Sequence, residues 1–183
     1  SAGGYGLHVP WGGSTITRNK VTDCAGVGIR YEKAYSQCNY NHVWNVLNRF
    51  ADLGGIYNWN SSTNLDKQPG MRCIGNHVHD IYRSNHGTTY GDAFLSHGIY
   101  QDDHSAGGVE DPHNIFDNVV YNIEGNGFNC RNIESIHLQN NLAFNCDQAL
   151  RIVGDQDDEF IEDLRFNGNV LIAKEATKDV MGL

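Results

Sequence analysis

The sequence has few of the features that mark membrane, nucleic-acid-binding or helical proteins. Its 183 residues include only 3 prolines. They contain no stretch near the ~18 consecutive apolar residues of a membrane-spanning helix. Basic residues are scarce, because 13 Lys and Arg face 22 Asp and Glu and give a formal net charge of -9. No long helical periodicity is present either. The sequence therefore predicts no membrane span, no nucleic-acid or anionic-membrane partner, and no globular α/β fold.

What the sequence does contain is a repeated pair of motifs. A short strand begins at a small residue and alternates inward apolar with outward polar positions. An Asn followed two residues later by an apolar residue comes after each strand. The strands begin at Gly6, Gly28, Gly55, Gly98, Gly127 and Ala149, and the asparagines are Asn19, Asn41, Asn76, Asn118, Asn141 and Asn169. Six occurrences in a fixed order predict a β-solenoid.

Three columns of apolar residues keep one register with these asparagines. Three residues before the Asn stand Ile16, Cys38, Cys73, Ile115, Leu138 and Phe166. Two residues after it stand Val21, Val43, Val78, Val120, Ala143 and Leu171, and five residues after it Cys24, Val46, Ile81, Ile123 and Cys146, until the register fails at Lys174. These columns predict the stacked interior. The Asn column predicts a ladder of side-chain amides, and the fourth position (Asp23, Asn45, Asp80, Asn122, Asn145) predicts a second turn column.

The repeats define one all-β domain over residues 1–183, with about six coils at residues 5–27, 28–54, 55–97, 98–126, 127–148 and 149–174. A solenoid end exposes unpaired strand edges unless a helix, a loop or a partner covers it. Neither end of this sequence resembles such a cap. We therefore expect an uncapped piece of a longer chain, whose partners are its remaining coils or a capping protein.

The five cysteines indicate packing rather than chemistry. Most occupy positions that are Val, Ile or Leu in other repeats, which is typical of small buried hydrophobic residues. The odd count and the absence of a CxxC pair argue against a zinc or redox motif. Cys38 and Cys73 are equivalent in neighbouring coils, ~4.8 Å apart by strand spacing, so a disulfide between them is geometrically conceivable.

Long insertions indicate where the functional site lies. The step from strand glycine to asparagine is short in the first two coils, but Gly55 to Asn76 spans 21 residues and Gly98 to Asn118 spans 20. A further insertion runs from about Tyr82 to His97. Long surface loops often carry function, so we expect them to flank a cleft over coils three to five.

The outward strand positions predict the chemistry of that cleft. The second and fourth residues after the strand glycine include Arg30, Glu32, Tyr57, Trp59, Tyr100, Asp102, Asn129 and Arg131. Aromatic rings that lie against sugar faces, with charged groups between them, suit an exposed groove for a hydroxyl-rich polymer. The alternative is that these side chains only form stabilising ladders on the sheet.

Three segments together resemble a known family. They are residues 54–59 (Gly-Gly-Ile-Tyr-Asn-Trp), residues 97–107 with the strand Gly98-Ile99-Tyr100-Gln101-Asp102-Asp103, and residues 116–122. Over roughly residues 50–146 the chain resembles right-handed parallel β-helix (pectate-lyase-like) carbohydrate-active proteins, closest to glycoside hydrolases with a GIYxDD/E strand. It departs from them at His104 and in the loop at residues 110–113. The resemblance implies a right-handed parallel β-helix, a poly- or oligosaccharide substrate, and a secreted, periplasmic or cell-surface location.

Glycoside cleavage needs two carboxyl groups, one acid and one nucleophile or base. Asp102 points outward by strand alternation and is the first candidate for nucleophile or base. Asp103 follows it and either braces the loop or shares the acid/base role. The partner is Glu124, or Glu32 at ~9.6 Å by strand spacing, near the separation of an inverting pair.

Histidines are candidates for supporting roles. His97 and His104 bracket the acidic strand, His86 lies in the adjoining insertion, and each is suited to orient substrate or a carboxylate. His42, His77 and His79 lie on another face with Trp44 at the fourth corner, so we expect stacking there rather than a zinc site. No metal or cofactor is otherwise expected, except that Ca²⁺ would suit the acidic loop from Asp155 to Glu159.

Two other functions remain open at this stage. A polysaccharide lyase or uronate epimerase is one, because Asp111-Pro112-His113 is similar to the Asp-Pro-His of alginate epimerases, although here it falls in a loop. Arg30, Arg131, Arg151, Tyr57 and Tyr100 supply candidate bases and uronate-neutralising groups. The other is a non-catalytic, carbohydrate-binding or adhesive solenoid.

Overall fold

The protein is built of parallel β-strands. The computed structural model describes residues 4–50, 52–59, 68–82, 96–102, 110–154, 163–175 and 181–182. Within these ranges every regular element is a strand, and every strand pairing is parallel. The described residues accordingly hold no helix that is long and apolar enough to cross a membrane. The predicted all-β class is confirmed at this level.

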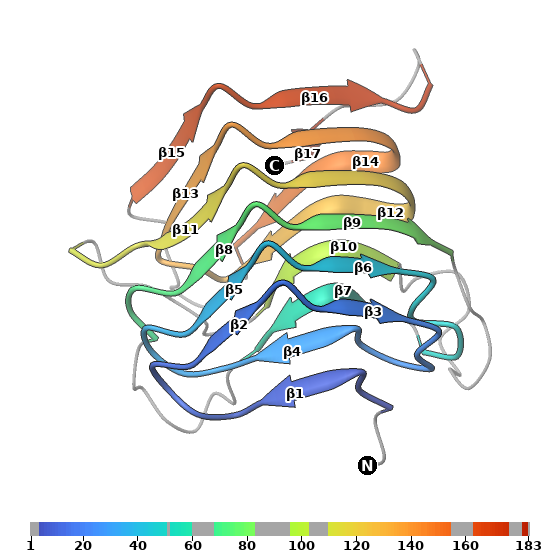
Figure 1. Ribbon diagram of the computed structural model, residues 1–183. Coiled ribbons are helices and arrows are strands. Elements are labelled where there is room, and N and C mark those ends of the chain that lie inside the picture. The colour runs from blue at the N-terminus through green and yellow to red at the C-terminus, as the bar shows by residue number, and fades with distance from the viewer. Residues whose placement is uncertain are drawn as a thin grey trace.

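The strands form two sheets, which repeat turn after turn along the chain (Figure 1). The six-stranded sheet has the order β15 (Asp163–Asn167), β13 (Ser135–Gln139), β11 (His113–Phe116), β8 (Arg72–Ile74), β5 (Gln37–Asn39) and β2 (Thr15–Thr17). The eleven-stranded sheet has the order β1 (Leu7–Val9), β4 (Ile29–Tyr31), β7 (Leu53–Asn58), β10 (Ser96–Gln101), β12 (Val119–Arg131), β9 (His77–Ile81), β6 (His42–Trp44) and β3 (Lys20–Thr22).

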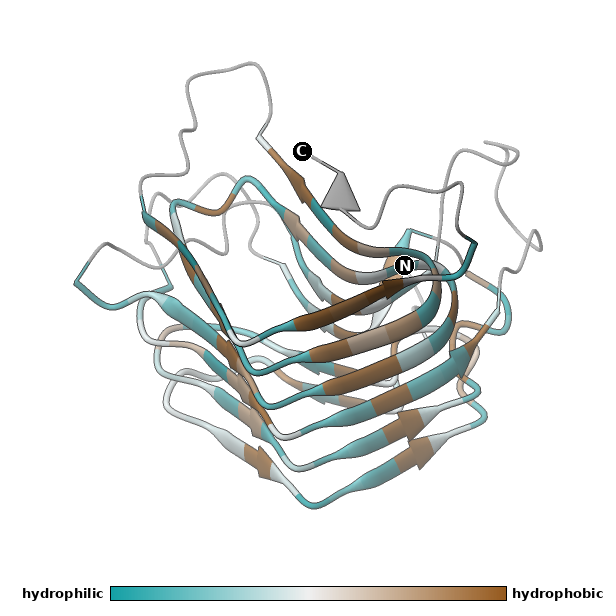
Figure 2. Cartoon of the chain, turned by 90° about the horizontal axis from the view of Figure 1, so that it is seen from above, coloured by the Kyte–Doolittle hydropathy of each residue, from teal (hydrophilic) through white to brown (hydrophobic). Residues whose placement is uncertain are grey.

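Two long strands, β12 and β14 (Leu142–Val153), connect the two halves of the larger sheet. The end of β12 pairs with β10, and its start pairs with β9. β14 pairs with β12 along both parts, and β16 (Val170–Ala173) and β17 (Met181–Gly182) pair with β14. We call β1, β4, β7, β10 and the ends of β12 and β14 the first wall. We call β3, β6, β9 and the starts of β12 and β14 the second wall. Seen from above, each turn follows nearly the same path as the turn behind it (Figure 2).

The predicted asparagine ladder is confirmed rung by rung. Each Nδ2 donates to the Oδ1 of the asparagine in the next turn, at 2.9 to 3.1 Å, from Asn19 through Asn169. The same Oδ1 atoms also accept the backbone N–H of the preceding rung at 2.9 to 3.0 Å. Side-chain amides therefore bridge all six turns inside one corner of the fold, where a buried backbone group would otherwise lack a partner.

The three predicted apolar columns also lie in register. Cys38 pairs with Cys73, Val43 with Val78, and Ile81 with Ile123, and most members are fully buried. Phe166, in the last strand of its sheet, is 41% exposed. The structure corrects the end of the third column, because Ala173, one residue before Lys174, pairs with Cys146 across a register shift. All five cysteines are free, including the Cys38 and Cys73 pair that geometry allowed to bond.

Residues with left-handed backbone turn each corner. The predicted second turn column has positive φ at every member, from 48° at Asn45 to 59° at Asp23. Asn and Asp tolerate this conformation because their short side chains bond locally. A further left-handed column, not predicted, directly precedes the ladder and comprises Arg18, Tyr40, Gly75, Asp117, Asn140 and Gly168.

The glycines that begin the first-wall strands are required by close packing. A Cβ built on Gly98 would lie 2.4 Å from Val120 Cγ1 and 2.6 Å from the carbonyl oxygen of Gly127. Gly6 and Gly28 face Val21 and Val43 in the same way, at 2.5 Å. The valine column of the second wall thus leaves no room for a side chain on the first-wall glycine that precedes each valine in the sequence.

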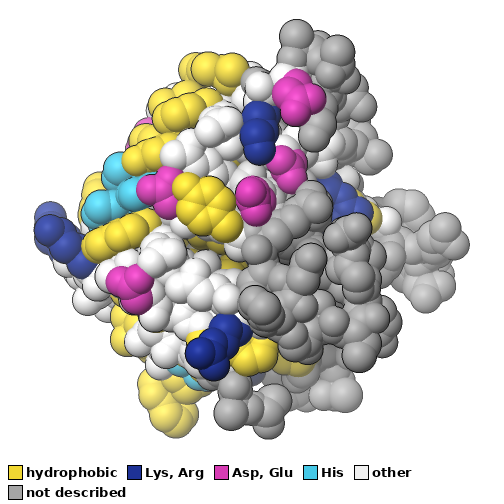
Figure 3. Space-filling model, turned by 90° about the vertical axis from the view of Figure 1, so that its right-hand side faces the viewer, with side chains coloured by type: hydrophobic (Ala, Val, Ile, Leu, Met, Phe, Trp, Pro, Cys, Tyr) yellow, Lys and Arg dark blue, Asp and Glu magenta, His cyan; other side chains and the backbone are white. Residues whose placement is uncertain are grey.

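Rings stack along the outer face of the second wall. His79 lies parallel to Trp44, with an interplanar angle of 8°, and to Tyr121, at 2°. Tyr121 stacks in turn on Phe144 at 6°. Figure 3 shows histidines gathered beside hydrophobic side chains on this part of the surface. The stacking expected for the histidine face is confirmed.

Candidate functional site

The outward residues of the first wall form the predicted column. Paired positions run from one strand to the next without a shift, so these side chains are vertical neighbours on one face of the sheet. In order, the column is His8, Arg30, Tyr57, Tyr100, Asn129 and Arg151. The prediction that Tyr57, Tyr100 and Asn129 are vertical neighbours on one face of the sheet is therefore confirmed.

The expected exposure of this column is wrong. Tyr57 is 6% exposed, Tyr100 2%, Asn129 1% and Asp102 7%. Arg30, Trp59 and Arg131 are partly buried, and Arg151 is exposed. Strand alternation tells which side of a sheet a side chain leaves, but not what lies over that side. The centre of the first wall is thus a buried polar cluster rather than an open groove.

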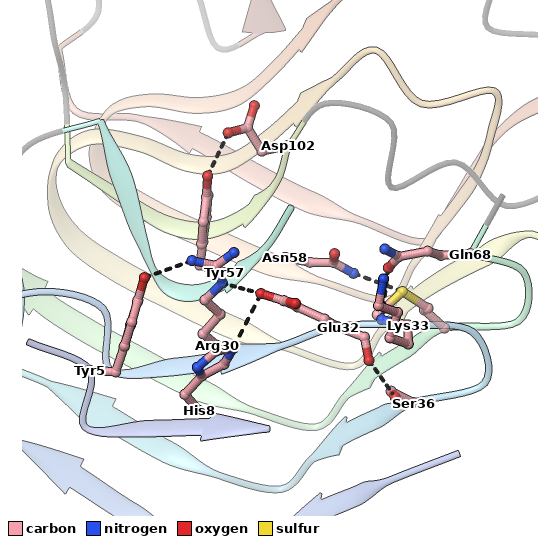
Figure 4. A network of polar contacts seen from close by, with 11 residues as sticks. Tyr5, His8, Arg30, Glu32, Lys33, Ser36, Tyr57, Asn58, Gln68 and Asp102 are labelled. Carbon is pink, nitrogen blue, oxygen red and sulfur yellow. Dashed lines mark hydrogen bonds and ion pairs between the residues drawn. The ribbon is translucent and has the colours of Figure 1, made fainter. Parts of the chain in front are cut away.

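Two tyrosines of the first wall converge on Asp102, and Figure 4 shows the one bond drawn to it, from Tyr57. The Tyr57 hydroxyl donates to Asp102 Oδ2 at 2.7 Å, and the Tyr100 hydroxyl is hydrogen-bonded to the same carboxylate. Burial, and then the charge of Asp102, raise the pKa of both tyrosines, so both remain protonated donors at neutral pH. Two phenol hydroxyls of neighbouring strands thus contact one carboxyl group.

A second charged group lies lower on the same wall. The Arg30 and Glu32 side chains form an ion pair, and both are 14% exposed. Arg30 Nη1 donates to the Tyr5 hydroxyl at 2.7 Å, and the guanidinium carbon lies 5.4 to 5.7 Å from the ring centroids of Tyr5, Tyr57 and Trp59. Such distances are typical of cation–π contacts. Aromatic rings and one carboxylate therefore hold the guanidinium in place.

His97 closes the cluster on the side of β12. Its ring packs edge-on against Tyr100, and Nδ1 accepts the Asn126 N–H at 3.3 Å. Burial, reinforced by the charge of Arg151, lowers the His97 pKa to about 3, so the ring is neutral. Nε2 faces the Asn129 amide at 3.3 Å. The Oδ1 atom of Asn129 has no hydrogen-bond partner among the described residues.

Glu124 does not lie beside Asp102. Tyr100 pairs with Asn129, so Asp102 is level with Arg131, which follows Glu124 by seven residues on β12. At about 3.3 Å per residue this separates them by roughly 20 Å of strand. The charge of Glu124 contributes instead to the raised pKa of Tyr82, on the second-wall side. The proposed Asp102 and Glu124 pair is wrong, because β12 runs through both walls and holds Glu124 away from the end that pairs with β10. The length of this strand was not predicted.

Several other candidates fall outside the described residues. These are Asp103, His104, His86 and the acidic loop from Asp155 to Glu159 that was considered for Ca²⁺. Among the described residues, one group offers converging ligand atoms for a metal ion, and it consists of His42, His77 and His79.

Sequence reasoning missed a polar layer behind the site. Asn58 and Gln101 occupy inward strand positions that were expected to be apolar, and both are buried. Gln101 Nε2 donates to the Tyr31 hydroxyl at 3.0 Å, and Asn58 Nδ2 contacts Met71 Sδ at 2.8 Å. The signal was available, because an amide in an apolar register position is a departure from the repeat. These residues lie on the strands that carry Tyr57 and Tyr100, and Asn58 Oδ1 and Gln101 Oε1 have no hydrogen-bond partner among the described residues.

Comparison with known proteins gave no match to a family model, to a curated protein or to a solved structure.

Proposed function

We propose that the stacked turns form a right-handed parallel β-helix and that the chain is a polysaccharide-active glycoside hydrolase with its site on the first wall. The observation that carries this proposal is the buried Asp102 carboxylate held by the Tyr57 hydroxyl at 2.7 Å. It lies on one face with Glu32, a tryptophan and an arginine. Buried carboxylates with fixed donors beside aromatic rings are the groups that cleavage of a sugar polymer requires.

The register supports a two-carboxylate mechanism. Arg30 pairs with Tyr57 and Tyr57 with Tyr100, so Glu32, Trp59 and Asp102, two residues further on, are level with one another. Two strand spacings put the Glu32 and Asp102 backbones ~9.6 Å apart. Inverting glycosidases hold their carboxyl groups about 6.5–9.5 Å apart, with room for a water. Trp59, between them, offers the ring face on which a sugar rests.

Asp102 takes the role of nucleophile or base in this proposal. Its two phenol donors stabilise the carboxylate, which suits attack or the activation of water. The acid that protonates the leaving oxygen is then Glu32 or Asp103. Glu32 is ion-paired with Arg30, whereas Asp103 adjoins Asp102 in the sequence.

Hydrolysis is favoured over β-elimination by the state of the tyrosines. A lyase needs a base that accepts a proton from the sugar ring, and Tyr57 and Tyr100 are the tyrosines nearest to Asp102. Their raised pKa keeps them protonated at neutral pH. Arg30 is occupied by Glu32 and Tyr5.

The test is turnover of a panel of neutral and uronate-containing polysaccharides. We expect new reducing ends without the ultraviolet absorbance of an unsaturated uronate. Asp102→Asn should reduce the rate at least ~10³-fold. Asp117→Asn is the matched control, because Asp117 is exposed in a turn with φ 57° that Asn tolerates, and it should leave the rate unchanged. Unsaturated products would identify a lyase, and binding without turnover an adhesive protein.

The acid is identified by substrates that differ in leaving group. Loss of a general acid slows substrates with poor leaving groups and spares aryl glycosides whose leaving group needs no proton. Glu32→Gln and Asp103→Asn should therefore differ, with only the acid variant rescued by a nitrophenyl glycoside. If neither variant shows this selective rescue, the two-carboxylate mechanism is wrong.

A further inference from the structure

Three histidines on the second wall are independent of the site around Asp102. His42 lies on β6, and His77 and His79 lie on the neighbouring β9. His42 pairs with His77, and Trp44 pairs with His79, so the three imidazoles occupy three corners of a square on the outer face. All three side chains are partly exposed, so a solute can reach them.

The ligand atoms of these histidines converge. One nitrogen from each ring lies within 4.8 Å of the others. His42 Nε2 and His79 Nε2 are 2.7 Å apart. One of these two nitrogens carries the proton that the other accepts. The His42 ring stacks on His77 at an interplanar angle of 11°, but it is tilted by 36° to both Trp44 and His79, so ring stacking does not account for its approach to His79.

Asp80 orients His79 for ligation. Its carboxylate lies 2.8 Å from His79 Nδ1, which donates and leaves the lone pair of Nε2 directed at His42. Asp80 accepts in turn from Asn122 Nδ2 at 2.7 Å and from the Tyr82 hydroxyl at 3.3 Å. A carboxylate behind a histidine is the usual outer support of metal-binding imidazoles.

An imidazole binds zinc, copper or nickel through the lone pair of one ring nitrogen, and each of the three rings offers one such atom to the cluster.

We propose that His42, His77 and His79 form a binding site for a divalent transition-metal ion, Zn²⁺ in the first place, with a fourth position open to water. Zn–N bonds of about 2.0–2.1 Å in a tetrahedron place the nitrogens roughly 3.3 Å apart. The His42 and His79 nitrogens are closer than this, and all three nitrogens lie within 4.8 Å of one another. Ring rotations would bring them to this spacing, with the metal replacing the proton between His42 and His79.

The test uses the full chain, freed of metal with a chelator and titrated with Zn²⁺ or Co²⁺ alone. We expect one ion per chain by calorimetry and the visible absorption of tetrahedral Co²⁺. His79→Phe keeps a ring between Trp44 and Tyr121 but removes a ligand, and should weaken binding at least ~100-fold. Asp80→Asn should weaken it about 10- to 100-fold, as loss of an outer support does.

A matched control comes from the other sheet. His137 Nε2 also contacts a carboxylate, Asp163 Oδ2, at 2.9 Å, but it does not belong to the histidine cluster. His137→Gln should bind the metal as the unaltered chain does. His42→Gln, which retains a hydrogen-bonding group, should lose binding as His79→Phe does. Binding that His79→Phe and His42→Gln leave unchanged, or no binding by the unaltered chain, would show that the histidines only stack.

Discussion

The asparagine ladder and the first wall are both buried polar structures, but they use their hydrogen-bonding groups differently. In the ladder, Asn118 Oδ1 accepts two N–H groups of Asn76, and its Nδ2 donates to the Cys73 carbonyl and to Asn141. In the first wall, Asn129 has one weak contact with His97. Its other amide atom lacks a partner among the described residues.

This difference indicates that the ladder stabilises the fold and that the first wall is a candidate binding site. A buried amide with every bond made stabilises the fold, whereas one with bonding capacity to spare costs free energy and calls for an explanation. A ligand that completes those bonds is the explanation adopted here. Substitutions in the two regions should therefore differ in their effects on stability and on turnover.

The largest expected effect is at the centre of the ladder. Asn118→Ala leaves the Asn76 N–H groups and the Cys73 carbonyl without their partners in a buried corner. At about 1–3 kcal/mol for each unsatisfied buried group, we expect a loss of about 3–5 kcal/mol in the free energy of unfolding. Urea denaturation measures it.

The end of the ladder supplies the control for this prediction. Asn19 is only partly buried, so water can replace its bonds to Thr17 and Asn41. Asn19→Ala should cost about 1 kcal/mol. Equal losses at Asn19 and Asn118 would mean that the ladder does not act as a buried, cooperative element.

The same comparison shows what the sequence can predict. The ladder recurs in six turns and the left-handed corner at Asp80 in five, so repeated copies of one pattern reveal a constraint that one copy would hide. The vertical neighbours Tyr57, Tyr100 and Asn129 were predictable for the same reason. Periodic structure is visible in a sequence because the physical requirement is periodic.

The site itself is not periodic, and this is where the prediction fails. The bond from Tyr57 to Asp102 joins two turns once, and the burial of both side chains depends on what lies over the wall. Glu124 was misplaced because β12 passes through both walls, and the repeated motifs do not contain the length of this strand. The convergence of His42 on His79 depends on ring rotation, which residue spacing does not contain.

The pH dependence of stability should distinguish His97 from an exposed histidine. Its folded pKa of about 3 lies below the ordinary histidine pKa of 6.5, so the unfolded chain binds the proton more readily. Stability is therefore lost as pH falls from about 6.5 towards 3, by about 1.4 kcal/mol per pH unit. Between pH 6.5 and 4 this amounts to about 3 kcal/mol.

The variant His97→Gln removes this dependence. Its free energy of unfolding should run parallel to that of the unaltered chain above pH 7, and the two curves should converge below pH 6 in urea titrations. Curves that stay parallel down to pH 4 would show that His97 is protonated in the folded state and that the cluster around Asp102 is open to water.

The strand glycines test the packing of the two walls. Gly98→Ala places a methyl group against Val120 and the Gly127 carbonyl, and overpacking of this kind costs about 1–3 kcal/mol. Gly13→Ala has open space but a φ of 67°, so it should cost about 1 kcal/mol through backbone strain alone. Thermal unfolding of both variants separates the clash from the strain, and a harmless Gly98→Ala would mean that the walls can move apart.

The smallest effect on stability should come from Asn129→Ala. This variant distinguishes a binding role for Asn129 from a structural role like that of the ladder. This variant removes one 3.3 Å contact with His97 and an amide atom that has no partner among the described residues, so we expect a loss below about 1 kcal/mol by urea denaturation. Turnover of the polysaccharide should nevertheless fall at least ~10-fold, because the unused amide is held for substrate. A loss of stability as large as that of Asn118→Ala, with turnover unchanged, would make Asn129 a structural residue like the ladder and remove the argument that the first wall is built to bind.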